Sequence, residues 1–156
     1  MTKVLLSIHV LAAILVVGPI TVAASLFPRY ARQASPVTAL LHRICRGYAV
    51  AGVAVPVFGL ATAAELGVLT DAWLLTSLAL TAVAAGVLAL AILPRQRLLL
   101  DAGGDDRGAG GEDGSDRGGA SRAAAARLAM LTGAFNILWA VVVVLMIVRP
   151  GSTTGA

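Results

Sequence analysis

One histidine lies inside a long apolar segment near the start of the chain. His9 follows a short apolar stretch that begins at Val4. If a helix enters an apolar layer near Val4, its rise of 1.5 Å per residue places His9 roughly 8 Å below the edge of that layer. At this depth an imidazole can stay neutral, ligate haem iron or copper, or relay a proton. His9 is therefore the leading candidate for a cofactor ligand.

A haem or metal site at His9 needs a second ligand. The other histidine, His42, is expected at the opposite face of the membrane, about 30 Å away, so one chain cannot bring both to one metal. Met146 and Met1 are at compatible depths and could supply a thioether, and a second copy of the chain could supply another His9. The alternative is a neutral His9 that is hydrogen-bonded to a neighbouring helix.

Four arginines flank the first two apolar segments on one side: Arg29, Arg32, Arg43 and Arg46. Such a collar can bind anionic lipid headgroups, or it can serve only to fix the orientation of the chain in the membrane. We expect that fixing the orientation of the chain is sufficient to explain these arginines. Binding to nucleic acid is not needed to explain the net charge of +4. The single cysteine, Cys45, permits no disulfide within the chain.

The composition predicts a membrane protein rather than a soluble domain. Of the 156 residues, 58% are hydrophobic and 13% are charged, against roughly 45–50% and about 25% in soluble domains. About 20 apolar residues are needed to span a bilayer as a helix. Four segments are long enough, and together they predict an all-α bundle of four transmembrane helices: about 4–26, 44–64, 72–93 and 124–148.

The distribution of arginine predicts the orientation of these spans. Ten of the twelve basic residues lie in the connections 27–47 and 94–127, whereas the connection 65–71 has none. Basic connections stay in the cytoplasm, so both termini are expected outside. The richness in arginine, alanine and glycine indicates a high-GC bacterial genome, and hence the bacterial plasma membrane. A cleaved signal peptide ending near Ala24 is the alternative, but cleavage there would send the first four arginines outward.

The connection after the third span has a different composition. Residues 101–119 contain eight glycines and six acidic residues, and such a sequence buries too little apolar surface to order itself. We therefore expect the helix to end at Pro94 and residues 98–120 to form a disordered cytoplasmic loop rich in Gly and Asp. Ser121 and the four alanines after Arg122 are expected to restart the helix.

Three residues within the spans are expected to shape the bundle. Pro19 and Pro56 each lack a backbone donor and can bend their helices. Asn136 lies near the middle of the fourth span, where an amide is expected to face another helix and form a hydrogen bond worth about 0.6 to 2 kcal/mol. We interpret Asn136 as a packing residue in preference to a substrate contact.

The first thirty residues carry a resemblance to known proteins. The run from His9 to Pro19, followed by Phe27, Pro28 and Arg29, resembles the opening helix of small bacterial four-span membrane proteins. These are similar to the copper-resistance D-type proteins and the haem-dependent membrane protoporphyrinogen oxidases. In the oxidase branch the resemblance implies a haem-associated histidine, which corresponds to His9, and a Pro-Arg pair at the helix end. The spacing is longer here, and no lysine lies within a span.

Three functions remain open at this point. The first is a non-enzymatic accessory or structural subunit that packs within a larger membrane complex or a homo-oligomer, surrounded by membrane lipid. The second is a haem- or copper-associated redox protein that uses His9. The third is a small transporter with a polar path lined by Ser7, His9, Thr21, Ser77, Thr81 and Asn136.

Overall fold

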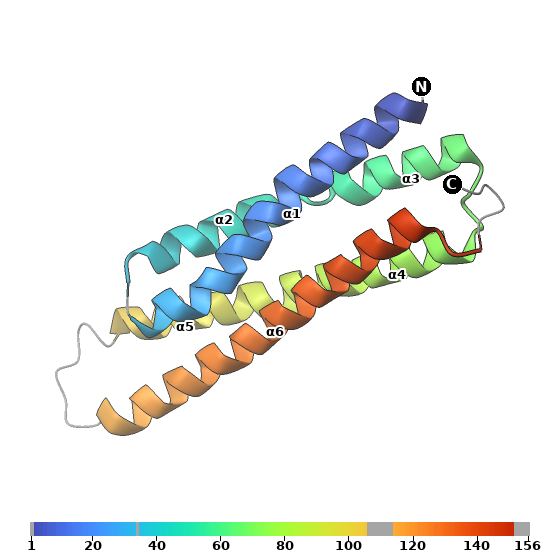
Figure 1. The fold of residues 1–156 in the computed structure, drawn as a ribbon. Coiled ribbons are helices and arrows are strands. Elements are labelled where there is room, and N and C mark those ends of the chain that lie inside the picture. The colour runs from blue at the N-terminus through green and yellow to red at the C-terminus, as the bar shows by residue number, and fades with distance from the viewer. Residues whose placement is uncertain (1, 34, 106–113, 152–156) are drawn as a thin grey trace.

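The regular elements of the protein are all helices within residues 2–33, 35–105 and 114–151, which the computed structural model describes. They are α1 (Thr2–Arg32), α2 (Val37–Ala51), α3 (Ala54–Leu66), α4 (Ala72–Gly86), the π-helix η1 (Val87–Ile92), α5 (Leu93–Asp105) and α6 (Gly114–Val148) (Figure 1). The helical stretches that are long and apolar enough to cross a membrane are Thr2–Arg32, Val37–Leu66, Ala72–Gly103 and Gly119–Val148. The prediction of an all-helical chain with four such stretches is confirmed.

The second stretch is divided into α2 and α3 just before Pro56. Pro56 has no N–H, and its ring would collide with the carbonyl of Gly52 in a regular helix. The N–H of Val55 donates to that carbonyl over 3.1 Å instead. Pro56 therefore interrupts the span, whereas Pro19 lies within the unbroken helix α1.

The third stretch does not end at Pro94, where the sequence predicted a stop. It continues through the π-helix η1 into α5, and the N–H of Leu93 donates to the carbonyl of Leu88, five residues earlier. This wider turn directly precedes Pro94 and gives room for a ring that an α-helical turn would exclude. The helix can therefore continue through Pro94, because the backbone hydrogen bond before it reaches back five residues instead of four.

The helices also extend into the predicted loop 98–120 from both sides. The backbone is helical up to Asp105 and again from Gly114, while residues 106–113 lie outside the described part of the chain. Adding a residue to an existing helix is easier than starting a new one. The apolar run 98–100 and the alanines 123–126 supply good helix formers on the two sides.

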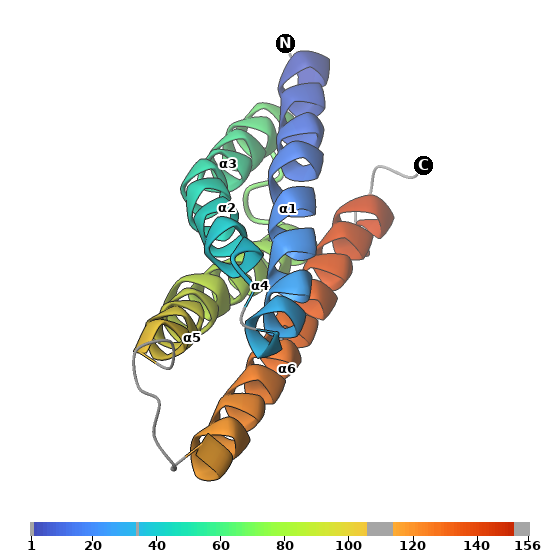
Figure 2. The same cartoon turned by 90° about the vertical axis from the view of Figure 1, so that its left-hand side faces the viewer.

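Helix α1 lies at the centre of the bundle, against α2, α3 and α6, and α4 packs on α6 (Figures 1 and 2). The largest buried side chains form a core in the half of the bundle away from the termini. Its members come from α1, α2, α4, η1 and α6: Ile20, Ala23, Ala24, Phe27, Leu41, Cys45, Ala84, Leu88, Ile92, Leu128 and Phe135. A smaller cluster of Ala63, Trp73 and Leu74 joins α3 to α4 near the other end.

The two ends of the bundle differ in charge. Both ends of the described chain and the connection between α3 and α4 lie at one end, which we call the termini end (Figure 1). The opposite end, which we call the arginine end, carries exposed arginines from four helices. They are Arg29, Arg32, Arg43, Arg46, Arg95, Arg97, Arg122 and Arg127.

Two identical substitutions should separate the core from the exposed surface. Leu128 is fully buried, whereas Leu15 is 64% exposed. We expect Leu128→Ala to lower the free energy of unfolding by about 1 to 3 kcal/mol. For a chain held in lipid or detergent this is below the about 2 to 5 kcal/mol of soluble cores, because lipid tails are as apolar as leucine. Leu15→Ala should change it by less than about 0.5 kcal/mol. Unfolding in detergent micelles would measure both, and equal losses would contradict this placement of the core.

Candidate functional site

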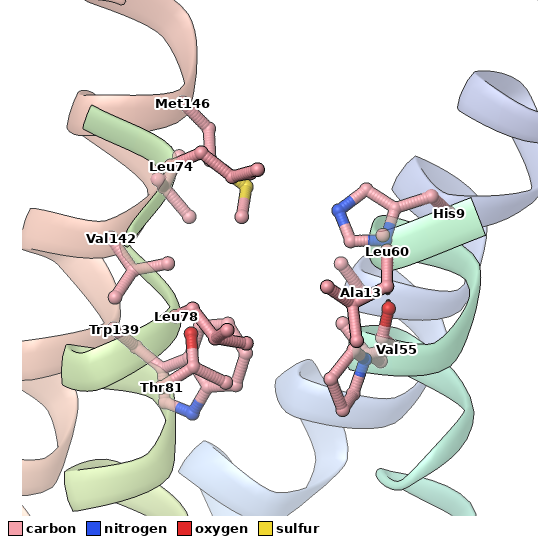
Figure 3. A pocket seen from close by; sticks show the side chains of 13 residues that line it. His9, Ala13, Val55, Leu60, Leu74, Leu78, Thr81, Trp139, Val142 and Met146 are labelled. Atoms are coloured by element: carbon pink, nitrogen blue, oxygen red, sulfur yellow. Dashed lines mark hydrogen bonds between the residues drawn. The ribbon is translucent and has the colours of Figure 1, made fainter. Parts of the chain in front are cut away.

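A cleft opens between two pairs of helices in the half of the bundle that contains the termini. Helices α1 and α3 form one wall, and α4 and α6 form the other (Figure 3). Its volume is about 60 Å³, which exceeds the roughly 10–15 Å³ needed to hold one water molecule. The lining residues are His9, Ala13, Val55, Pro56, Gly59, Leu60, Leu74, Leu78, Thr81, Trp139, Val142, Val143 and Met146.

His9 is the one ionisable residue in this lining, and its side chain is 8% exposed. Its Nδ1 lies 2.9 Å from the backbone carbonyl oxygen of Val55 on α3. A carbonyl can only accept a hydrogen bond, so Nδ1 must carry the proton and donate it. In the neutral imidazole the other nitrogen, Nε2, then has a free lone pair. Figure 3 shows the second ring nitrogen directed across the cleft, away from Val55.

Gly59 gives the imidazole the space that it occupies. A Cβ atom at Gly59 would lie 2.9 Å from Cε1 and 3.2 Å from Nδ1 of His9, closer than a carbon side chain can approach without movement. Gly59 therefore leaves space for the imidazole of His9. The helix is interrupted just before Pro56, and in the turn at this break the carbonyl of Val55 faces α1 and accepts the hydrogen bond from His9.

Met146 lines the opposite wall of the same cleft. The structure therefore brings together the two residues that were predicted as cofactor ligands, one from α1 and one from α6, with the Met146 side chain facing His9 (Figure 3). Met1 lies outside the described residues. Trp139 also lines the cleft.

Thr81 is the one hydroxyl residue of the lining, and its side chain is already engaged. The Thr81 hydroxyl donates to the Ser77 carbonyl at 2.7 Å, one turn earlier in its own helix. Within the described residues, no group of three or more His, Cys, Asp or Glu side chains could hold a metal ion. A metal in the cleft would therefore depend on His9 and a sulfur ligand.

His42 lies at the arginine end and takes no part in the cleft. Its Nδ1 donates to Oε1 of Gln96 at 3.0 Å, and Nε2 of Gln96 lies 3.6 Å from Sγ of Cys45. Gln96 is fully buried and links α5 to α2. Sequence reasoning missed Gln96 because the helix was expected to stop at Pro94, which would have left residue 96 in a solvated loop.

Asn136 makes a contact between helices rather than within the cleft. Its Nδ2 donates to Oγ of Ser25 at 3.2 Å, which joins α6 to α1. Its Oδ1 is buried and has no hydrogen-bond partner among the described residues. The amide thus uses one of its two N–H donors across this interface, and its oxygen accepts no hydrogen bond from the described residues.

The polar side chains considered for a transport path do not gather along one surface. Ser7 donates to the Lys3 carbonyl on the exposed side of α1, and Ser77 donates to the Trp73 carbonyl within α4. Of the six, His9 and Thr81 share the cleft, and Asn136 is bonded to Ser25. Most of these hydroxyl groups therefore serve their own helices.

No family model, curated protein or solved structure matches the chain.

The geometry at His9 predicts a specific effect of filling the space beside it. Gly59→Ala should displace the imidazole and break the hydrogen bond to Val55, because the new methyl group would overlap Cε1. We expect the ¹⁵N signals of His9 in labelled protein to show the Nδ1–H tautomer in the unaltered chain and to lose that signature in Gly59→Ala. Gly18→Ala is the control, since a Cβ there has no atom within 4 Å. An unaltered His9 spectrum in Gly59→Ala would contradict this description.

Proposed function

We propose that the protein is a multi-pass protein of the bacterial plasma membrane with both termini outside. The asymmetry of charge supports this orientation, because the exposed arginines of four helices gather at one end. Basic residues near span ends are retained in the cytoplasm. The arginine end would then be cytoplasmic, and the cleft at His9 would lie in the outer half of the membrane.

We further propose that the cleft binds a soft metal centre through His9, as haem iron or as copper. The observation that carries this proposal is the pairing of the Nδ1–H of His9 with the Val55 carbonyl over 2.9 Å. Metal-ligating histidines almost always donate their second ring N–H to a carbonyl or carboxylate, which fixes the ring and its tautomer. The same bond leaves Nε2 as a free electron-pair donor that faces the cleft.

The opposite wall supports a soft metal in particular. The thioether of Met146 lines the cleft across from His9, and thioether and imidazole together suit copper(I). The same pair is also an axial ligand set of haem iron. A cleft of about 60 Å³ accommodates an ion as it stands. A haem group would require α1 and α3 to move away from α4 and α6.

A binding role, as an accessory subunit of a membrane complex or as an electron carrier, agrees better with this site than catalysis or transport. His9 is the one ionisable residue among those that line the cleft, so a second group for acid–base chemistry would have to come from elsewhere. Three of the four hydroxyl groups considered for a transport path, those of Ser7, Ser77 and Thr81, donate to carbonyls of their own helices instead.

The metal proposal is tested by the absorbance spectrum of the purified protein for haem and by its metal content for copper(I). We expect a preparation in detergent to bind haem, with a Soret band, or copper(I) in about equimolar amount. His9→Ala should abolish binding and Met146→Leu should weaken it, because each removes one ligand. His42→Ala is the matched control, since it removes a histidine at the other end of the bundle. A protein that stays colourless and metal-free after exposure to haem and to copper(I) would refute the proposal.

The proposed orientation has its own test. Single cysteines introduced at Thr2 and Gly151, in a chain where Cys45 is replaced by alanine, should react with a membrane-impermeant maleimide applied to intact cells. A cysteine at Gln33, in the connection between α1 and α2, should react only after the membrane is opened. Protection of both terminal positions in intact cells would reverse the orientation.

A further inference from the structure

A second hollow lies on the outer face of α2, apart from the His9 cleft. Its volume is about 270 Å³. Its lining residues all lie on one face of α2, which begins at the arginine end. The lining residues are Leu40, Arg43, Ile44, Gly47, Tyr48 and Ala51. Gly47 leaves the floor of this groove open, since a Cβ there would meet no atom within 4 Å.

The groove combines one cation with apolar residues on the same face of α2. Arg43 is exposed and lies toward the arginine end, while Gly47 and Ala51 follow it at intervals of one helical turn. The path from Arg43 to Ala51 is about 12 Å long at 1.5 Å per residue. Its polar and apolar parts are therefore arranged as the phosphate and the upper acyl chain of a phospholipid are.

The charges around the groove favour an anionic occupant. The arginine end carries the eight exposed arginines from four helices, and Asp101 is the one acid there whose side chain lies in the described part of the chain. Glu65 and Asp71 lie at the opposite end. Basic sites between and beside membrane helices bind the headgroups of anionic lipids, so charge complementarity selects a lipid with a net negative headgroup over a zwitterionic one.

We propose that this groove is a binding site for one anionic phospholipid. Arg43 binds the phosphate, and an acyl chain lies along Gly47 and Ala51 beside the ring of Tyr48. The site requires the helices to span a membrane, but it is independent of the metal site at His9 and of which end faces the cytoplasm. Arg46, the nearest arginine on α2, is outside the groove lining and contributes only to the general positive field.

The experiment compares phosphatidylglycerol with phosphatidylethanolamine of the same acyl chains. Native mass spectrometry of the full chain in detergent measures how much of each lipid stays bound at equal concentration. We expect phosphatidylglycerol to be retained in preference. Arg43→Gln should weaken its retention about fivefold, which corresponds to about 1 kcal/mol for one arginine. Arg46→Gln removes the same charge from the same helix and should have less than half of that effect on the free energy of binding.

A second pair of variants tests the apolar part of the groove without a change in charge. Gly47→Leu fills the floor and should displace phosphatidylglycerol, whereas Gly18→Leu adds the same side chain at an open position of α1 and should not. Circular dichroism shows that each variant is folded. Equal losses in Arg43→Gln and Arg46→Gln, equal retention of the two lipids, or full retention in Gly47→Leu would each overturn the proposal.

Discussion

In the proposed membrane placement the four apolar helical stretches are surrounded by hydrocarbon, which offers no hydrogen-bond partner, and this constraint would govern the polar groups within them. Each polar side chain within a span must find its partner in the protein itself. Most hydroxyl groups do so locally, by donating to the carbonyl one turn earlier, as Thr62 does to Phe58 and Thr132 does to Leu128. Such bonds satisfy the side chain but leave the packing of helices to other contacts.

The polar groups that reach another helix are few, and each joins a different pair. His9 joins α1 to α3 through the Val55 carbonyl, and Asn136 joins α6 to α1 through Ser25. Gln96 joins α5 to α2, where it accepts a hydrogen bond from His42. Because lipid tails compete equally well for apolar surface, these contacts and the close-packed core between them determine how the helices are arranged.

The sequence predicted what depends on hydropathy and length, and missed what depends on the relative rotation of helices. The four spans follow from apolar segments of sufficient length, and the similar depth of His9 and Met146 follows from the fixed rise of a helix. That both residues face one cleft depends on how α1 and α6 are turned toward each other, which no local pattern encodes. The continuation of the helix past Pro94 depends on the π-helix η1, and Gln96 could be recognised only once that continuation was known.

The position of the cleft also bears on what can bind there selectively. In water, an apolar cleft would bind any apolar ligand, because removing the apolar surface of its walls from water lowers the free energy. In the bilayer that we propose for this protein, the competing occupant would be a lipid tail that is as apolar as the walls, so burial of apolar surface would yield little net affinity. A lipid tail cannot satisfy the free lone pair of His9, however, and burying a polar group without a partner costs roughly 1 to 3 kcal/mol. Selectivity must therefore come from a ligand that engages Nε2, and the hydrogen bond from Nδ1–H to Val55 is what keeps that nitrogen directed into the cleft.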